Sequence, residues 1–473
     1  MHPKSTSESL TRSAPNGFGA ATVFLFIFHH SHIADLLNTE YIKYLATRYK
    51  VVVFLPKREG RASLAENEYY KHENVEYREQ ELLHEKWWYR FKLLRTACIR
   101  QFDSLVSVRW NYDKNKYTDW RRTLLRRMSL LVPKSWMSTR TFTWLEGRML
   151  PDEIFFKDAV AKYKPRIVLT ATPGFTPFDA WAVLLAKKHR VPTCSINFTW
   201  DNLTSNGKFM RKTDYLVVWN GIIKQEALDY HRYTPESVFV SGPLRFDPYF
   251  TPMQGEMSRE TFLRTKGLDP GAKTILIGTM TDNNYSGHVE LIEYVLKLRD
   301  SGAIEPCNIF VRVHPIDHFN KYEGLIARKI KHLHIERAGT PLFDDRAPGQ
   351  KVQMNQDDMR NLKHTLKYCD LCVNPFSTLS IEAMIFDKPV INLGLIPKHR
   401  PSLEYVHYKP LIDSGSVRVA YTDAELEEYL TLYLAHPETD REERRTIVQK
   451  YVGYTDGLSY KRSVDALDTI LRR

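Results

Sequence analysis

Two hydroxyls and a carboxylate lie close together between residues 368 and 394, where the sequence reads as strand, polar turn, helix, Lys-Pro break and strand. Ser377 and Thr378 fall at the first turn of the helix, where unpaired backbone N–H groups and the helix dipole favour an anion. Glu382 lies on the same helix face, roughly 6 Å further along the axis. This pattern suits a nucleotide, with phosphate at the helix start and ribose on the carboxylate. The alternative is that Ser377 is only an N-cap and Glu382 only a solvated helix residue.

This segment resembles the nucleotide-binding element of GT-B glycosyltransferases and of their relatives, the CDP-glycerol glycerophosphotransferases and the UDP-N-acetylglucosamine 2-epimerases. In those families a Ser/Thr pair and an acidic residue on such a helix face the diphosphate and the ribose. The resemblance implies phosphate contacts for Ser377 and Thr378 and a ribose contact for Glu382. It indicates the class of ligand and not the sugar.

Two further loops follow strands of the same region. Gly278 and Thr279 begin the loop GTMTDNN, where the glycine permits close backbone approach and the threonine offers a hydroxyl to a phosphate. Arg312 and His314 close the strand NIFVRV and bring a permanent charge and a titratable donor. The alternative is an ordinary turn, a surface arginine and a structural histidine. Three anion-friendly loops after neighbouring strands favour one shared site.

The dipeptide His314-Pro315 resembles the HP element of bacterial sialyltransferases, capsule Kdo transferases and glycerophosphotransferases. The resemblance implies that His314 contacts the phosphate or nucleotide of an activated donor. It also favours a cytidine nucleotide slightly over other bases.

The loop INFTWDNLTSNG, residues 196–207, follows a buried strand in the first half of the chain and is dense in polar residues. Such a loop is either a cluster of turns or a site. Asp201 and Asn202 could bind the hydroxyls of an acceptor, and Asp201 could take a proton as general base. The stretches WDNLTSNG, YLVVWN and SGPLRFD resemble a group of bacterial surface-carbohydrate proteins of GT-B type, over about residues 165–247 and from 273 to the end.

Histidines follow the first predicted strand in the run HHSH. In GT-B enzymes the loop after the first strand commonly faces the acceptor, so the resemblance implies that His30 is a catalytic base and His29 an acceptor contact. Capping of the next helix by Ser31 is the alternative. A metal is not expected, because adjacent histidines diverge in most backbones and the first acidic residue is Asp35.

Neither pair of adjacent aspartates lies in a setting that would hold a divalent cation on a diphosphate. Asp344–Asp345 falls in a loop and Asp357–Asp358 at a helix start. We therefore expect no metal and no cofactor, with protein dipoles and cations neutralising the leaving phosphate. At the probable hinge, Arg245 and Asp247 could reach a cleft or form a structural pair.

Strands and helices must position these residues, and they alternate along most of the chain. Apolar runs such as KVVVFLP and KTILIG suit strands buried on both faces, and the segments between them have helical periodicity. This alternation predicts parallel sheets with right-handed crossovers. The fold class expected is α/β, with two Rossmann-like doubly wound domains facing a cleft and ligands at the carboxyl ends of the strands.

The expected organisation has four parts. Residues 1–19 form a disordered tail, and residues 20–246 form the domain on the acceptor side. A helical, basic and aromatic insert interrupts this domain at about 69–148. Residues 247–473 form the domain that binds the nucleotide donor.

Composition narrows the class of protein. The 473 residues carry a formal net charge of +12, which suits an anionic partner. Five cysteines without a paired framework suit core thiols and a reducing cytosol. No stretch reaches the roughly 18 consecutive apolar residues of a membrane span. The expected location is the cytoplasm, with peripheral attachment to the inner face of the cytoplasmic membrane as an additional expectation.

The insert mixes bulky aromatic and cationic residues. Such helices can lie on an anionic bilayer, with Trp at the interface and cations towards the headgroups. The alternative is a partly buried helical subdomain with a solvated arginine face. Nucleic acid is not an expected partner, because no recognised motif is present and a charge of +12 spread over the chain is not a concentrated stripe. The residues are Trp87, Trp88, Tyr89, Arg90, Phe91, Lys92, Arg121, Arg122, Arg126 and Arg127.

Together these features predict a metal-independent glycosyltransferase that moves a sugar from a nucleotide-activated donor to a surface-glycan or lipid-linked acceptor, in capsule or lipopolysaccharide synthesis. A 2-epimerase-type enzyme or a polyol-phosphate transferase on the same fold is one alternative. A non-catalytic module that binds glycan or nucleotide is another.

Overall fold

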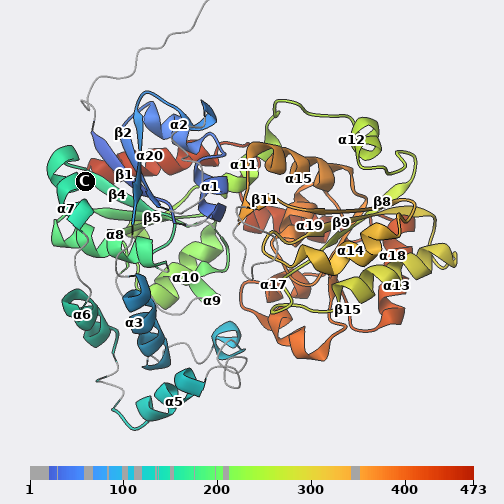
Figure 1. Cartoon of the computed structure of the whole chain (residues 1–473), viewed down its shortest axis with the longest axis horizontal. Coiled ribbons are helices and arrows are strands. Elements are labelled where there is room, and N and C mark those ends of the chain that lie inside the picture. The colour runs from blue at the N-terminus through green and yellow to red at the C-terminus, as the bar shows by residue number, and fades with distance from the viewer. Residues whose placement is uncertain are drawn as a thin grey trace, which may run out of the picture.

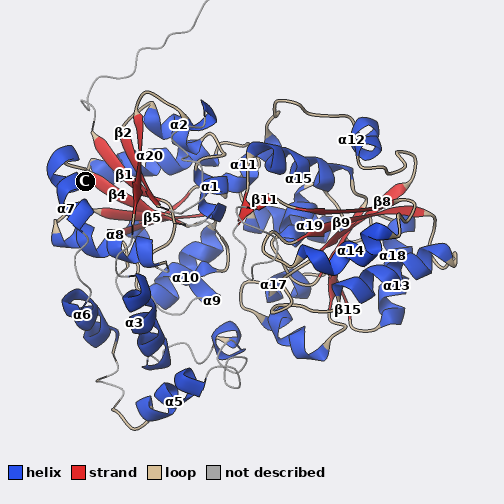
Figure 2. Ribbon diagram, in the orientation of Figure 1, coloured by secondary structure: helices blue, strands red, loops and turns tan. Residues whose placement is uncertain are grey.

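The chain folds into two α/β units that lie side by side (Figure 1). The structure is a computed structural model that describes residues 21–28, 30–57, 68–81, 85–98, 105–110, 120–133, 136, 138–149, 154–174, 176–197, 199–205, 212–341 and 352–473. The tail expected at residues 1–19 lies outside these ranges. Each unit is built around one parallel sheet covered by helices (Figure 2).

The first unit contains a seven-stranded parallel sheet with the order β3-β2-β1-β4-β5-β6-β7. Its strands are β1 (Thr22–Phe26), β2 (Lys50–Pro56), β3 (Val75–Gln80), β4 (Ile167–Thr170), β5 (Thr193–Ile196), β6 (Tyr215–Val218) and β7 (Val238–Val240). Its helices are α1 (His30–Leu36), α2 (Tyr41–Ala46), α3 (Glu85–Cys98), α5 (Trp120–Ser129), α6 (Thr139–Met149), α7 (Ile154–Tyr163), α8 (Pro177–Lys188), α9 (Asn202–Ser205) and α10 (Gly221–His231).

The second unit contains a six-stranded parallel sheet with the order β10-β9-β8-β13-β14-β15. Its strands are β8 (Lys273–Gly278), β9 (Cys307–Val313), β10 (Leu333–Arg337), β13 (Leu371–Asn374), β14 (Val390–Leu393) and β15 (Arg418–Ala420), and β11 (Thr340–Pro341) pairs antiparallel with β12 (Val352–Gln353). Its helices are α12 (Arg259–Thr265), α13 (His288–Asp300), α14 (Glu323–Ala327), α15 (Gln356–Tyr368), α16 (Leu379–Ile385), α17 (Lys409–Asp413), α18 (Asp423–Ala435) and α19 (Arg441–Tyr451). The predicted α/β class with two doubly wound units is confirmed.

Alternation along the central strands explains how helices cover both faces of the first sheet. Val23 and Leu25 of β1 point into a core with α1 and α2, whereas Phe24 and Phe26 point into a core with α7 and α8. All four side chains are fully or almost fully buried. Because both faces are covered, these strands read as continuous apolar runs in the sequence.

The insert begins later than expected. Residues 75–80, which were assigned to it, form β3 and pair with β2 at the sheet edge. The helices α3, α5 and α6 follow and hang from the first unit at the lower left of Figure 1. The helices α3 and α6 share a small core of Phe91, Cys98 and Phe142, while Trp88 packs into the main sheet core. The sequence missed β3 because it is only half buried and has little apolar alternation.

The chain crosses between the units twice. The first crossing runs through η4 (Leu244–Phe246) and α11 (Asp247–Phe250), and the second leads into α20 (Ser459–Leu471). Although the expected division at residue 247 places α20 in the second unit, this helix packs on the first sheet through Val464, Leu467 and Ile470. Figure 1 shows it in red beside the blue strands.

The two crossings are fastened to each other. Both carboxylate oxygens of Asp247 accept hydrogen bonds from the start of α20, at 3.0 Å from Ser459 N and 2.9 Å from Tyr460 N. Gly457 has a φ of +70°, and a Cβ on it would lie 2.6 Å from Cγ2 of Thr251. Of the alternatives for Asp247, the structure thus shows a structural contact, although with α20 and not with Arg245.

All five cysteines are free and buried, as predicted for core thiols. Within the described ranges, no helix has both the length and the apolar character that a membrane crossing requires.

Candidate functional site

Three loops predicted to share a site come from three neighbouring strands, β9, β8 and β13. Because the strands are parallel, their carboxyl ends meet at one edge of the second sheet. Oγ1 of Thr279, after β8, accepts a hydrogen bond from the backbone N–H of His314, after β9, at 2.9 Å. Nε2 of the buried His288 accepts from the N–H of Met280 at 2.9 Å and holds the same loop. The first two predicted loops are therefore joined directly.

The third loop joins the others through Gly278. A Cβ on Gly278 would collide with Cδ2 of Leu379, the first residue of α16. The missing side chain thus lets α16 start against the end of β8. The close approach to Gly278 is thus made by the helix α16. A contact between Gly278 and a ligand stays a prediction.

Ser377 serves the start of α16. Its Oγ accepts from the N–H of Leu379 at 3.2 Å and donates to Oδ1 of Asn374 at 3.2 Å. This hydroxyl is therefore engaged within the turn before α16, although the N-cap residue of this helix is Thr378 and not Ser377. The helix is only seven residues long, which leaves little dipole for an anion. Thr378 is half-buried, and its hydroxyl has no hydrogen-bond partner among the described residues.

His314 uses one ring nitrogen within its own loop. Its Nδ1 accepts from the N–H of Ile316 at 3.3 Å. Burial lowers the pKa of the ring, which favours the neutral form. A neutral ring with Nδ1 as acceptor carries its proton on Nε2, and in the described part of the chain no group accepts that proton. His314 can therefore donate one hydrogen bond to a ligand at neutral pH.

Arg312 is not a free cation. It is 7% exposed, and its Nη1 lies 3.0 Å from Oε1 of Glu336 on β10. Lys266 and His334 also contact Glu336, and with Arg312 they lower the pKa of that carboxyl to about 2. Glu336 therefore compensates the charge of Arg312, and a contact between Arg312 and a ligand stays a prediction. Its Nη2 is buried and has no hydrogen-bond partner within the described ranges.

Glu382 is buried at the meeting point of the two units. Its Oε2 accepts a hydrogen bond from the hydroxyl of Tyr249 on α11, at 2.8 Å. Burial and the adjacent Glu382 carboxylate raise the pKa of Tyr249, which therefore stays a donor. Oε1 of Glu382 has no partner in the described part of the chain, so this atom can accept a hydrogen bond from a ligand.

The charge of Glu382 is balanced from the hinge. Arg245 lies in the field of Glu382 and forms a 3.0 Å ion pair with Asp35 of α1. Burial raises the pKa of Asp35 to about 6, although the guanidinium of Arg245 opposes this shift. One arginine at the hinge thus sits between a carboxylate of the first unit and a carboxylate of the second.

On the first unit, Asp201 lies in the loop after β5. Its Oδ1 accepts from the hydroxyl of Thr199 at 2.6 Å, and its Oδ2 from the hydroxyl of Ser205 at 3.0 Å. Asn202 is 2% exposed, and its amide donates to Oδ1 of Asn197 at 3.0 Å. Asn202 is therefore not accessible to an acceptor, because its side chain is buried in this turn and its amide is hydrogen-bonded to Asn197.

Two groups near Asp201 were missed by sequence reasoning. His407 of the second unit lies with its Nδ1 at 3.1 Å from Oγ1 of Thr204, and burial lowers the pKa of its ring. Burial raises the pKa of Glu226 on α10 to about 8, and the Asp201 charge adds to this. Oε2 of Glu226 has no partner among described residues. Neither residue lies in a motif, and only the fold brings both to Asp201.

The predicted histidines of the first unit are not tested. His29 lies outside the described residues. His30 begins α1, and its side chain also lies outside what the structure describes.

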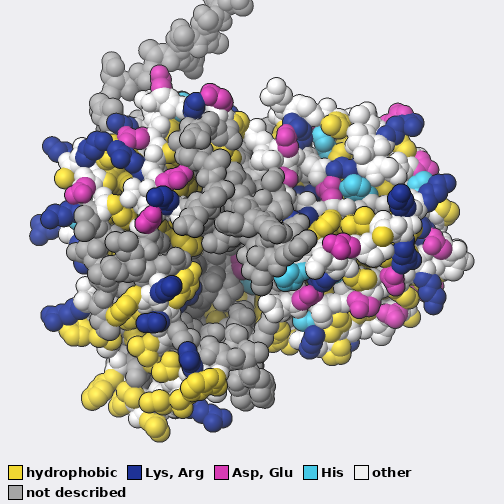
Figure 3. Space-filling view, in the orientation of Figure 1, with side chains coloured by type: hydrophobic (Ala, Val, Ile, Leu, Met, Phe, Trp, Pro, Cys, Tyr) yellow, Lys and Arg dark blue, Asp and Glu magenta, His cyan; other side chains and the backbone are white. Residues whose placement is uncertain are grey.

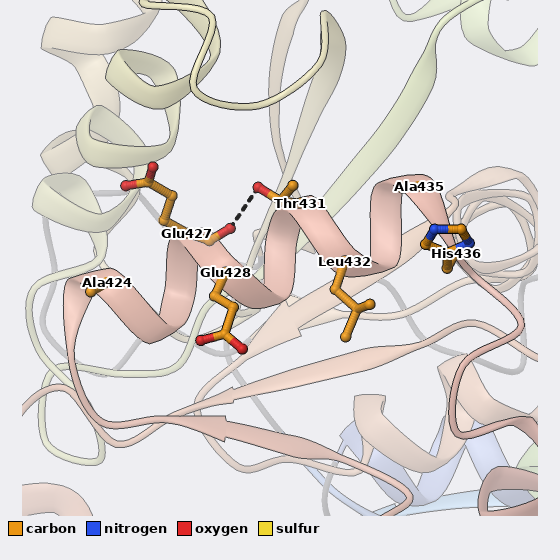
Figure 4. Close-up of a pocket in the computed structure, with 7 residues that line it drawn as sticks. All are labelled: Ala424, Glu427, Glu428, Thr431, Leu432, Ala435 and His436. Carbon is orange, nitrogen blue, oxygen red and sulfur yellow. Dashed lines mark hydrogen bonds between the residues drawn. The ribbon is translucent and has the colours of Figure 1, made fainter.

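Three hollows are relevant to the search for a site. A cavity of about 350 Å³ lies between the units, lined by Trp110 of the first and by Asp282, Asn283, Lys398 and His399 of the second. It adjoins the loop that carries Thr279. A second hollow of about 400 Å³ lies on the hinge side, between Lys43 and Arg360. The third is lined by one face of α18 alone, from Ala424 to His436, and contains no predicted site residue (Figure 4).

Within the described ranges, no group of three or more His, Cys, Asp or Glu side chains is placed to hold a metal ion.

No family model and no curated protein matches this chain. Solved structures do match over nearly its whole length. S. aureus MnaA, solved with UDP, has a TM-score of 0.55 and 11% identity, covering 96% of this chain and 97% of that chain. UDP-GlcNAc 2-epimerase from Neisseria meningitidis, bound to UDP-GlcNAc, has a TM-score of 0.53 and 12% identity, covering 95% and 100%. A glycosyltransferase from Rickettsia africae has a TM-score of 0.51 and 14% identity, covering 96% and 100%. At such identities the likeness establishes the fold, which is GT-B.

Proposed function

We propose that this chain is an enzyme that transfers a sugar, or a related phospho-polyol, from a nucleotide-activated donor to a surface-glycan or lipid-linked acceptor. The observation that carries the proposal is the convergence of the loops after β9, β8 and β13 at one sheet edge. This edge holds an N–H donor on His314 and a hydroxyl on Thr378, both without a partner among the described residues, and a carboxylate oxygen on Glu382. Ligands of open parallel sheets bind at such carboxyl ends.

The donor binds the second unit in this proposal. Nε2–H of His314 and the hydroxyl of Thr378 donate to the diphosphate, and Oε1 of Glu382 accepts from a ribose hydroxyl. Ser377 shapes the loop through its hydrogen bond from the N–H of Leu379, and Thr279 positions His314. No metal or cofactor is required, since hydrogen-bond donors stabilise the leaving phosphate. Loss of one such donor typically costs about 2.7–4 kcal/mol of barrier.

The acceptor binds beside Asp201 on the first unit. Its oxygen forms a bond to the donor's reacting carbon while the bond from that carbon to the phosphate oxygen breaks. The acceptor proton passes to the carboxylate of Asp201, and the electron pair of the broken bond leaves with the nucleotide. His407 and Glu226 lie within the electrostatic influence of this carboxylate, and His30 remains a second candidate for the base.

An epimerase is the second candidate function. Two of the structural neighbours are known as UDP-GlcNAc 2-epimerase or were solved with UDP, which favours a reaction on the nucleotide sugar itself. Such an enzyme needs no acceptor. Incubation with donor alone followed by product analysis separates the two reactions. An epimerase would convert the donor into its isomer, whereas a transferase without acceptor would form no new sugar isomer.

The nucleotide is identified first by thermal shift. The full chain is heated with CMP, CDP, UDP, GDP and TDP, and we expect one diphosphate or CMP to raise its melting temperature. The variant Glu382→Ala should lose that shift, while Glu290→Ala, an exposed glutamate on α13, should keep it. If no nucleotide shifts the parent chain, or if both variants respond like the parent, the proposed donor site is wrong.

A further inference from the structure

Large apolar side chains are exposed on the helices that hang from the first unit. Among the most exposed are Trp120 (68%), Leu131 (87%), Trp136 (69%) and Trp144 (56%), on or directly after α5 and on α6. Figure 3 shows hydrophobic side chains gathered over α3, α5 and α6, with Lys and Arg between them. Soluble proteins rarely expose apolar groups in such a concentration without a partner. We call this surface, made by the exposed residues of α3, α5, α6, 130–133 and Trp136, the insert face.

The insert also holds most of the excess charge. Residues 85–149 contain 15 Lys and Arg and 5 Asp and Glu, a net charge of +10 out of +12 for the whole chain. The expectation that this charge is spread over the chain is therefore wrong. The one carboxylate among the described side chains of this segment, Glu146, is buried beside Arg95 at 3.8 Å.

Cations and aromatic rings are interleaved on the insert face. The guanidinium of Arg121 lies 5.6 Å from the ring centroid of Trp120, and that of Arg148 lies 4.9 Å from the ring of Trp144. Exposed Arg127 and Arg140 lie on the same helices. Each exposed tryptophan of these pairs thus has a positive charge beside it, the arrangement that places a ring at the headgroup level of a bilayer and a cation on an anionic headgroup.

We propose that the insert face docks on an anionic lipid bilayer. Insertion of tryptophan and leucine would remove the exposed apolar area from water, and the cations would pair with anionic headgroups. A second copy of the chain is disfavoured, because it would bring two faces of the same charge together. Nucleic acid would match the charge but would leave side chains such as Leu131 in water.

The insert connects this face to the acceptor side of the cleft. Oγ of Ser107 donates to the carbonyl of Thr204 at 2.6 Å, three residues from Asp201. Trp110 lies against Tyr405 of the second unit and lines the cavity between the units. If the proposed transfer is correct, the bilayer is also the source of a lipid-linked acceptor for Asp201. This last step alone rests on the proposed function.

The test is co-sedimentation of the full chain with vesicles, without donor or acceptor. We expect binding to vesicles of phosphatidylcholine mixed with phosphatidylglycerol, weak binding to phosphatidylcholine alone, and weaker binding as salt increases. The measurement does not involve nucleotide, so its failure would leave the thermal-shift test of the donor site untouched.

Two variants separate the apolar and the charged contributions. Leu131→Ser with Trp136→Ser removes apolar area, and Arg121→Gln with Arg127→Gln and Arg140→Gln removes three charges. We expect each variant to lower the vesicle–water partition coefficient of the chain more than tenfold. For the charge variant, this follows from a loss of about fivefold per cation. Matched controls on the second unit are Met257→Ser with Ile326→Ser, and Lys297→Gln with Lys331→Gln and Lys450→Gln, all at exposed positions. These should bind like the parent.

Three outcomes would overturn the proposal. One is absence of vesicle binding, or binding that the insert variants retain. Another is binding to a DNA or RNA oligonucleotide that only the charge variant loses, without vesicle binding, which would make nucleic acid the partner. The third is self-association in sedimentation velocity that the Leu131→Ser, Trp136→Ser variant abolishes, again without vesicle binding.

Discussion

The hydroxyl of Tyr249 donates a hydrogen bond of 2.8 Å to Oε2 of Glu382. Tyr249 belongs to the short helix of the first crossing, whereas Glu382 belongs to α16 of the second unit. Arg245, one turn earlier, is paired with Asp35 of the first unit. The orientation of the carboxylate proposed to bind ribose therefore depends on the same segment that sets the position of the two units.

Tyr249→Phe should weaken nucleotide binding about five- to tenfold. The buried carboxylate of Glu382 loses the hydrogen bond that orients it, and such a bond contributes roughly 1 kcal/mol. Isothermal titration calorimetry with the nucleotide selected by thermal shift measures this change. The control is Tyr294→Phe, which removes a hydroxyl that donates to the carbonyl of Asp423 far from the site. Equal nucleotide affinities of the parent chain and Tyr249→Phe would show that Glu382 does not bind the ribose.

Asp201→Asn should leave nucleotide affinity unchanged and lower turnover by about 10²–10⁴, the usual contribution of a general base. Steady-state transfer assays and the same calorimetric titration give the two quantities. Asp229→Asn, an exposed aspartate on α10, provides the control and should retain full turnover. An Asp201→Asn variant with parental turnover would move the base to another residue.

Glu226 should make the stability of the chain depend on pH. Its pKa is raised from 4.5 to about 8 by burial and by Asp201, so between these values the unfolded chain loses a proton that the folded chain keeps. The free energy of unfolding therefore falls as pH rises through this window, by at most about 1.4 kcal/mol per pKa unit. Glu226→Gln lacks this loss.

The measurement for Glu226 is the melting temperature at pH 5 and pH 8.5. The difference between Glu226→Gln and the parent should grow in favour of the variant at the higher pH. Glu290→Gln, on the exposed face of α13, should track the parent at both values. A difference that stays constant with pH would show that Glu226 is ionised in the fold.

Gly457→Ala should destabilise the chain more than Gly453→Ala. Both glycines have positive φ, +70° and +74°, so both substitutions carry the same backbone strain. Only at Gly457 would the new Cβ meet Cγ2 of Thr251, which adds about 1–3 kcal/mol of overpacking. Thermal melts of both variants test this, and equal losses would mean that the two crossings are not packed tightly against each other.

Local sequence signals were sufficient for much of the fold. Continuous apolar strands such as Val51–Leu55, alternating with amphipathic helices, predicted two doubly wound sheets. The three strand-end loops could be grouped because parallel strands place their carboxyl ends at one edge. The edge strand β3 has no such signal, since nearly all its residues are half buried and none is fully buried.

Contacts between distant segments were beyond the sequence. Nothing local in Arg312 reveals that Glu336 neutralises it, and nothing in Asn202 reveals its bond to Asn197. His407 and Asp201 are 206 positions apart, and only the association of the two units brings them together. The placement of α20 could not be predicted for the same reason. The apolar periodicity of this helix does not indicate which of the two sheets it covers.

The return of α20 to the first sheet has a consequence for biosynthesis. Val464, Leu467 and Ile470 complete a core whose other members are translated more than 200 residues earlier. A ribosome that has finished β7 therefore presents a nascent first unit in which this part of the core stays uncovered until α20 has been synthesised. Chain termination before Ser459 would leave that part of the core permanently uncovered, and we expect such a product to aggregate or be degraded.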